Sequence, residues 1–143
     1  MSYNEIPIML VDNFVLPNKP LSNLEIFDAA KKLALYGVRG VFLRDTLPTK
    51  TKLNECGILN LDSFSGDSTH WVMWFKKGKD KFYFDSYWVQ PPCELIAYLE
   101  PPIFYNSERV QQNDEVFCGH LCLFTLKQLS LGNNLQTVIN YLM

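Results

Sequence analysis

The chain has 143 residues, 48% of them hydrophobic and 20% charged, a composition typical of one globular domain and unlike that of a disordered chain. Its net charge of -2 argues against a partner bound mainly through nucleic-acid phosphates, and no apolar run reaches the ~18 residues of a membrane span. The first residues lack a basic region and a small-residue cleavage site, so we expect no secretory signal. We therefore expect a single domain over residues 1–143, with no membrane partner, in an intracellular reducing compartment where the four cysteines remain thiols.

The first predicted element is a helix. The segment Ser22-Asn23-Leu24-Glu25 matches a capping box, in which a serine hydroxyl and a glutamate carboxylate bond the free N–H groups at a helix start. Gly37 is the expected stop, because glycine is the common residue just after a helix. Short strands are predicted next, over 40–43 and 57–61.

Residues 70–85 are predicted to form a β-hairpin. The run from His70 to Phe75 is apolar on both faces, which indicates a buried central strand. The lysine-rich residues 76–80 are expected to form a solvated turn, and 82–85 returns as the partner strand.

The second half of the chain is mainly helical. A short helix is predicted over 93–99 between two proline pairs, and a strand over 103–105. A buried helix over 118–129 and an amphipathic helix over 135–142 follow. A helix, then a cluster of strands, then helices favours an α+β fold with a small, mostly antiparallel central sheet flanked by helices.

Cys118 is the cysteine best placed for chemistry. Thiol catalysis needs a thiolate, and the predicted helix that starts at Cys118 would favour one through the positive end of its dipole. Gly119 is expected to leave the backbone open to a substrate, while Cys122 lies one turn deeper in the core. We expect Cys118 to be the only strongly reactive thiol, with Cys56 and Cys93 reacting slowly.

A base and a group that orients it are available in the hairpin. His70 opens one strand and Asp85 closes the other, so the two lie side by side and can face Cys118 in the order His, Asp, Cys. Each residue alone also fits a structural role: a packed cysteine, a core histidine, a solvated carboxylate. We expect no metal, because Cys118, His120 and Cys122 do not share one helix face.

Five segments carry a resemblance to a known family: Asn54 to Asn60, Ser68 to Val72, Phe84 to Tyr87, Arg109 to Gln111 and Phe117 to Phe124. Over roughly residues 37–130 the chain resembles the adenovirus protease (adenain) family. It looks closest to the adenain-like proteases of Polinton/Maverick elements and related DNA viruses, in a clan that includes the SUMO-specific proteases. The resemblance implies a papain-like cysteine protease fold with the catalytic residues in permuted order.

The resemblance also implies site residues. Cys118 matches the nucleophile, His70 the general base, Asp85 the third triad member and Trp71 the aromatic residue after the base. Gln111 stands at the adenain spacing of the oxyanion-hole side chain.

Three positions depart from a simple match. Gln112 stands at the spacing of the SUMO proteases, so the spacing alone leaves both glutamines open, and the preceding Val110 favours Gln111. No cysteine lies around Glu100, where adenovirus enzymes bind an activating peptide through a disulfide, so an activating peptide would bind non-covalently. Trp88 stands where relatives often carry glycine.

The implied activity is cleavage after glycine in viral or transposon structural precursors, in the host nucleus or cytoplasm or within a virion, with no cofactor and no essential nucleic acid. Trp71 and Trp88 would form the walls of a narrow substrate channel, and Leu, Ile or Met would be preferred three positions upstream of the glycine. A protease that removes ubiquitin-like modifiers is the alternative enzyme. A catalytically silent domain that binds extended peptides is the alternative of another class.

Overall fold

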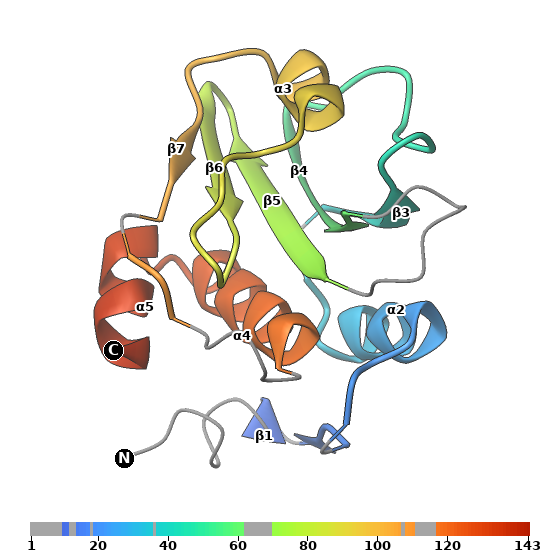
Figure 1. The fold of residues 1–143 in the computed structure, drawn as a ribbon, viewed down its shortest axis with the longest axis vertical. Helices are drawn as coiled ribbons and strands as arrows, with labels where there is room; N and C mark the ends of the chain where they lie inside the picture. The colour runs from blue at the N-terminus through green and yellow to red at the C-terminus, as the bar shows by residue number, and fades with distance from the viewer. Residues whose placement is uncertain are drawn as a thin grey trace.

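A computed structural model describes residues 10–11, 14–17, 19–35, 37–61, 70–106, 108–110 and 117–143. Over these ranges the chain is a mixed α+β protein, as the element order predicts (Figure 1). In chain order the elements are β1 (Leu10–Val11), β2 (Phe14–Val15), α2 (Asn23–Lys32), β3 (Val38–Leu43), β4 (Asn54–Asn60), β5 (Trp71–Lys77), β6 (Asp80–Phe84), α3 (Cys93–Leu99), β7 (Phe104–Tyr105), α4 (Cys118–Ser130) and α5 (Leu135–Leu142).

The main sheet has the order β3-β4-β5-β6-β7 and is mixed. β4, β5 and β6 pair in antiparallel fashion, whereas β3 pairs with β4 and β6 pairs with β7 in parallel. The three central strands are antiparallel, as the sequence predicts, whereas the parallel pairing of the two outer strands was not predicted. Residues 44–53 and 85–103 carry the chain back along the sheet, which parallel pairing requires.

Both faces of the sheet are covered, and β5 contributes to both. Figure 1 shows α2, α4 and α5 on one side of the strands and α3 on the other. Met73 packs in the larger core with α2, α4 and α5, while Val72 and Trp74 pack in a smaller core with α3. This confirms the prediction of a central strand that is buried on both faces.

The predicted start of α2 is confirmed and its predicted end is wrong. The Ser22 N–H donates to the Glu25 carboxylate (2.9 Å), and the Glu25 N–H donates to the Ser22 hydroxyl (3.2 Å). The helix ends at Lys32, and Ala34 takes the left-handed conformation (φ 52°) before Gly37 is reached. Gly37 instead allows close packing, because a Cβ there would lie 2.8 Å from the Asn54 carbonyl oxygen.

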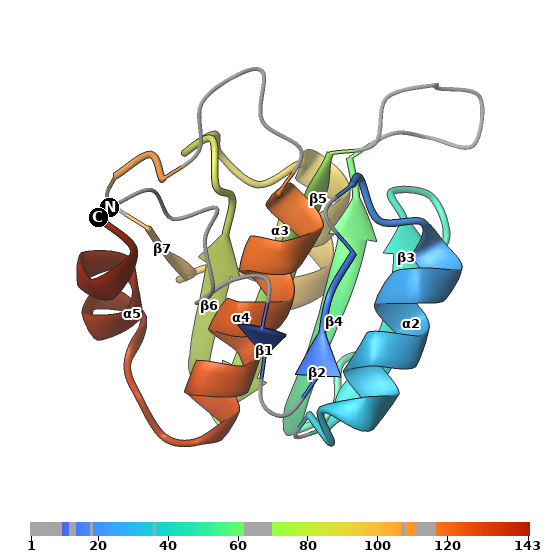
Figure 2. The same ribbon diagram turned by 90° about the horizontal axis from the view of Figure 1, so that it is seen from below.

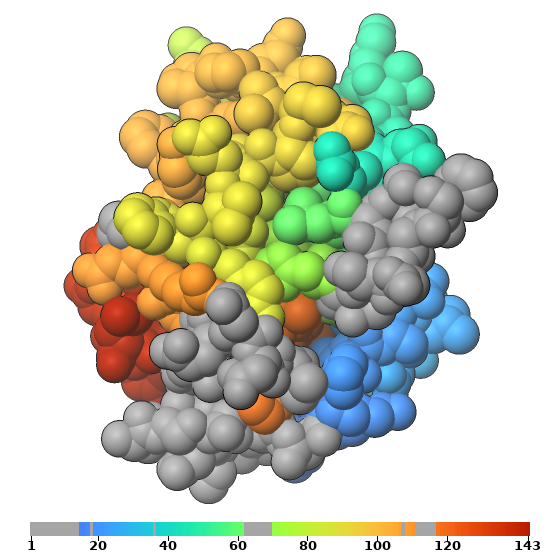
Figure 3. Space-filling view, viewed as in Figure 1, coloured from blue at the N-terminus to red at the C-terminus, as the bar shows by residue number. Residues whose placement is uncertain are grey.

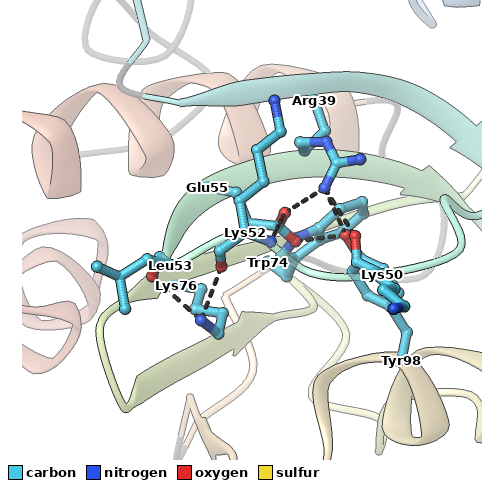
Figure 4. Close-up of polar contacts among 8 residues, drawn as sticks. All are labelled: Arg39, Lys50, Lys52, Leu53, Glu55, Trp74, Lys76 and Tyr98. Atoms are coloured by element: carbon cyan, nitrogen blue, oxygen red, sulfur yellow. Dashed lines mark hydrogen bonds and ion pairs between the residues drawn. The ribbon is translucent and has the colours of Figure 1, made fainter.

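The buried carboxylate of Glu55 bonds residues of several elements at the end of the sheet where β4 begins (Figure 4). Glu55 is fully buried and accepts hydrogen bonds from Arg39 (2.6 Å), the Lys52 N–H (3.0 Å), the Trp74 indole (3.1 Å) and the Tyr98 hydroxyl. Burial alone would raise the pKa of this carboxyl, but the hydrogen bonds outweigh it, so the pKa lies below its ordinary value. The cluster joins β3, β4, β5 and α3.

Lys76 belongs to the same end of the sheet and is not solvated as predicted. Its side chain is buried, and its ammonium donates to the carbonyls of Lys52 (2.7 Å) and Leu53 (3.1 Å). β5 continues to Lys77, so the turn is confined to the two residues before Asp80. Among the described residues, no helix is both long and apolar enough to cross a bilayer.

Candidate active site

The structure brings His70 and Asp85 together at the open end of the β5–β6 hairpin. His70 directly precedes β5 and Asp85 directly follows β6, and in this antiparallel pair those ends are adjacent. His70 Nε2 and Asp85 Oδ1 lie 2.6 Å apart, the length of a charge-assisted hydrogen bond. The His70 side chain is 13% exposed and the Asp85 side chain is fully buried, so little water competes for this contact.

A tight turn over residues 85–88 orients the Asp85 carboxylate. Its Oδ1 accepts from the Tyr87 N–H (2.8 Å), and the Trp88 N–H donates to the Asp85 carbonyl (2.8 Å). This is an Asx turn, in which an aspartate side chain bonds the backbone two residues on. The second carboxylate oxygen, Oδ2, is buried with no hydrogen-bond partner in the described part of the chain. The carboxylate thus presents one oxygen, Oδ1, to His70.

The Tyr87 ring fixes the plane of the imidazole. The rings of His70 and Tyr87 stack with centroids 4.2 Å apart and planes 4° apart. The Arg109 guanidinium lies 5.0 Å from the centroid of the Tyr87 ring. An aromatic face stabilises a cation placed against it, so the stack favours an imidazolium.

Cys118 is the first residue of α4 and lies against the start of β5. Its Sγ accepts from the Trp71 N–H (3.4 Å), and it also interacts with His70 through a hydrogen bond and through charge. One turn later the Cys122 thiol donates to the Trp71 carbonyl (3.4 Å). The two sulfurs therefore hold the Trp71 peptide between them and keep His70 beside Cys118.

The charge of His70 suits an ion pair with the thiol. Burial lowers its pKa, but the hydrogen bonds and charges of Asp85 and Cys118 outweigh burial and raise the pKa to about 9. The ring is therefore an imidazolium at neutral pH. Because Nε2 is engaged by Asp85, Nδ1 is the nitrogen left to exchange a proton with the thiol. A helix N-terminus and an imidazolium both favour the thiolate form of cysteine.

The remaining thiols differ in burial. Burial raises the pKa of Cys56 to about 12 and that of Cys122 well above the ordinary range. Cys93 is exposed, and its thiol donates to the Glu94 carboxylate (3.4 Å). Cys118 itself is only 8% exposed and is therefore less exposed than Cys93, contrary to expectation. Any higher reactivity of Cys118 must come from His70 and from the start of α4.

His120 has a structural position on the buried side of α4. It is fully buried, and its Nε2–H donates to the Pro17 carbonyl (2.7 Å). Burial lowers its pKa, so it is neutral at pH 7. Its ring packs edge-on against Phe117, the residue that precedes α4.

Gly119 does not present an open backbone to solvent, as was expected. It is buried, and a Cβ there would lie 3.2–3.3 Å from side-chain atoms of Ile26, Leu21 and Trp71. The missing side chain lets the start of α4 pack closely against α2 and β5. This glycine therefore positions Cys118 by allowing close packing.

The two tryptophans predicted to line a channel lie in different surroundings. Trp71 is 4% exposed, and its indole N–H donates to the Leu21 carbonyl (3.0 Å). Trp88 is 55% exposed, in the segment after β6 that is yellow in Figure 3 and lies at the molecular surface. Its φ of 61° is left-handed, a conformation that favours glycine.

A pocket of about 460 Å³ adjoins the site on the side of Trp71. It lies at the edge of the sheet where β3 and β4 end, β5 begins and α2 starts, an arrangement visible in Figure 2. Its lining is largely apolar and consists of Leu21, Ser22, Asn23, Val41, Phe42, Leu43, Thr46, Asn60 and Trp71.

Gln111 and Gln112, the candidates for an oxyanion-hole side chain, lie outside the described residues. The chain just before them is anchored beside Asp85, because the Val110 N–H donates to the Ser86 carbonyl (2.9 Å).

Tyr87 and Asn106 are the residues near this site that the sequence analysis missed. Tyr87 carries a weak signal, an aromatic side chain two residues after the candidate acid, and Asn106 carries none beyond its place after a short strand.

In the described part of the chain, no group of three or more His, Cys, Asp or Glu side chains could hold a metal ion. Comparison of the chain with protein-family models and with curated protein sequences finds no match.

Proposed function

We propose that this protein is a cysteine endopeptidase with a papain-like active site in permuted order. One observation carries the proposal: a buried aspartate holds a histidine at 2.6 Å, and that histidine interacts with a cysteine at the first position of a helix. Cys118 is the nucleophile, His70 the general acid and base, and Asp85 the residue that orients His70. This set of groups is what acyl transfer by a thiol requires.

The mechanism follows from the order of these contacts. The Cys118 thiolate attacks the scissile carbonyl, and the His70 imidazolium gives its proton to the leaving amine as the peptide bond breaks. Water then attacks the thioester, with neutral His70 taking its proton, and the acid product leaves with the thiolate restored. The Cys118 N–H at the helix start and the Gln111 side chain stabilise the oxyanion in both steps.

The proposed substrate is a polypeptide with glycine at the cleaved position. The resemblance to adenain-like proteases supports this choice, and so does the apolar pocket beside Trp71, which suits a Leu, Ile or Met side chain upstream of the glycine. We propose that the natural substrates are structural precursors of a virus or a transposon, cleaved within the host cell or the virion. We expect turnover without a metal, a disulfide-linked peptide or nucleic acid.

Two measurements on the purified protein test the proposal. In a peptide library, we expect cleavage after glycine that is abolished by Cys118→Ala and retained in Cys93→Ala, the matched removal of an exposed thiol. Brief iodoacetamide treatment at pH 7 followed by mass mapping should modify Cys118 before Cys93. Cleavage that survives Cys118→Ala would refute the assignment of the nucleophile. Selective labelling without cleavage of any peptide would favour a domain that binds peptides.

A further inference from the structure

Asn106 makes a concentrated set of buried hydrogen bonds around the backbone of Asp85. Its side-chain Oδ1 accepts from the Asp85 N–H (3.1 Å), and its Nδ2 donates to the Asp85 carbonyl (2.8 Å). The same Nδ2 donates to the Glu108 carbonyl (2.9 Å). Asn106 is only 3% exposed, so these bonds face little competition from water.

The place of Asn106 in the sheet explains this geometry. β7 pairs with β6 in parallel through Phe82 with Phe104 and Tyr83 with Tyr105, and the pairing stops there. Asn106 is the next residue, and its carboxamide continues the ladder by offering Asp85 both a donor and an acceptor, as a peptide group would. Among side chains only a carboxamide supplies a fixed donor and a fixed acceptor on one planar group.

Holding the Asp85 peptide also fixes its carboxylate. The backbone of Asp85 is bonded on both sides by Asn106, and the Tyr87 and Trp88 N–H groups complete the turn. We propose that Asn106 is a positioning residue that acts through Asp85, keeping Oδ1 on His70 Nε2. This inference rests on the proposed thiol chemistry for its role in turnover, although the contact itself can be tested without it.

Two further hydrogen bonds link this arrangement to the chain segment before Gln111. Nδ2 of Asn106 holds the Glu108 carbonyl, and the Val110 N–H bonds the Ser86 carbonyl (2.9 Å). Asn106, Glu108 and Val110 are thus held beside Asp85 and Ser86. The chain segment that leads towards Gln111 is held in register with the residue that orients the base.

The direct test is an NMR titration of the two histidines in Asn106→Ala. Asp85 and Cys118 set the charge environment of His70, with the Tyr87 ring stacked on it and Arg109 against that ring. We expect the pKa of His70 to fall from about 9 by roughly 1, a tenfold weaker hold on its proton. His120 should titrate unchanged and serves as the internal control.

Asn54→Ala is the matched control for general loss of stability. Asn54 also bonds a backbone group with its side chain, the Gly78 N–H (3.0 Å), but at the far end of the hairpin. The Asn54→Ala variant should have a lower melting temperature and an unchanged titration of His70. Asn106→Ser, which lacks the carboxamide, should reproduce the shift and serves if Asn106→Ala does not fold.

Kinetics test whether the effect passes through Asp85. We expect Asn106→Ala to lower kcat roughly 10–100-fold with little change in KM, as small misplacements of catalytic groups do. In an Asp85→Ala background, the same change should lower kcat less than about twofold, because the two residues act as a unit.

An unchanged pKa of His70, an equal loss of kcat in both backgrounds, or loss of folding in both Asn106 variants would overturn the positioning role. If the unmodified protein cleaves no peptide, the proposed function fails. The titration of His70 then still tests whether Asn106 positions the Asp85 carboxylate.

Discussion

Replacing Asp85 by asparagine should remove the negative charge that faces His70 and should preserve the turn over residues 85–88. The carboxamide of the Asp85→Asn variant would keep a side-chain oxygen for the Tyr87 N–H but would carry no negative charge for the imidazolium. Burial lowers the pKa of His70, and Asp85 comes first among the groups that raise it. The pKa of His70 in Asp85→Asn should therefore return to the ordinary 6.5 or below it.

The size of the effect follows from the pKa of His70. A rise from 6.5 to about 9 corresponds to about 3 kcal/mol of preference for the imidazolium in the folded protein. Because the folded pKa is raised, this stabilisation is fully present below pH 6.5 and is lost as the pH rises towards 9. The difference in unfolding free energy between the unmodified protein and Asp85→Asn should then shrink by up to about 3 kcal/mol between about pH 6 and about pH 9.5.

Urea unfolding at a series of pH values measures this difference. Asp80→Asn, which removes an exposed carboxylate at the other end of β6, controls for net charge and should show a small difference that does not change with pH. A difference between the unmodified protein and Asp85→Asn that stays constant over this pH range would refute the claim that Asp85 holds an imidazolium. We also expect His70→Ala to reduce cleavage more than Asp85→Asn, because it removes the proton carrier itself.

Three further changes probe other residues. Trp88→Gly should be more stable than Trp88→Ala by about 1 kcal/mol in urea unfolding, because only glycine adopts the positive φ of this position without strain. If Trp88 forms a wall of the substrate channel, Trp88→Gly should also accept a wider range of residues at the cleaved position. Tyr87→Phe should keep the ring stacked on His70, whereas Tyr87→Leu should slow alkylation of Cys118 at pH 7 by about tenfold, the equivalent of one cation–π contact. Glu55→Gln should lower the unfolding free energy by about 3 kcal/mol at pH 7. Because the Glu55 carboxyl stabilises the fold only while it is ionised, the difference in unfolding free energy between the unmodified protein and the variant should narrow as the pH falls below 4.5 through the lowered pKa of Glu55.

Features that depend on neighbours in the sequence were predictable. The capping box of Ser22 and Glu25 joins residues three apart, and the apolar period of residues 135–142 matches α5 to the residue. The hairpin also follows from local pattern, and with it the juxtaposition of His70 and Asp85.

Features that depend on distant packing were not predictable. Gly119 reads as an open backbone in the sequence, but α2 and β5 pack against it from more than 40 residues away. Parallel pairing of the outer strands depends on how the crossover connections run. Asn106 reaches Asp85 across 21 residues, and no periodicity marks such a contact.

Two buried carboxylates, those of Asp85 and Glu55, lie at opposite ends of the central strand. His70 and Asp85 meet where β5 begins. Lys76, which donates to the Lys52 and Leu53 carbonyls beside Glu55, lies near the end of β5, roughly 20 Å from His70 at about 3.3 Å per residue. Every carboxylate oxygen of Glu55 is bonded, whereas Oδ2 of Asp85 is buried without a partner in the described residues. A fully bonded buried carboxylate suits a rigid anchor. Under the proposed function, the Asp85 carboxylate instead faces an imidazole whose charge changes during turnover. Changes at the two ends should therefore add independently, with Glu55 acting on unfolding alone and Asp85 on the titration of His70.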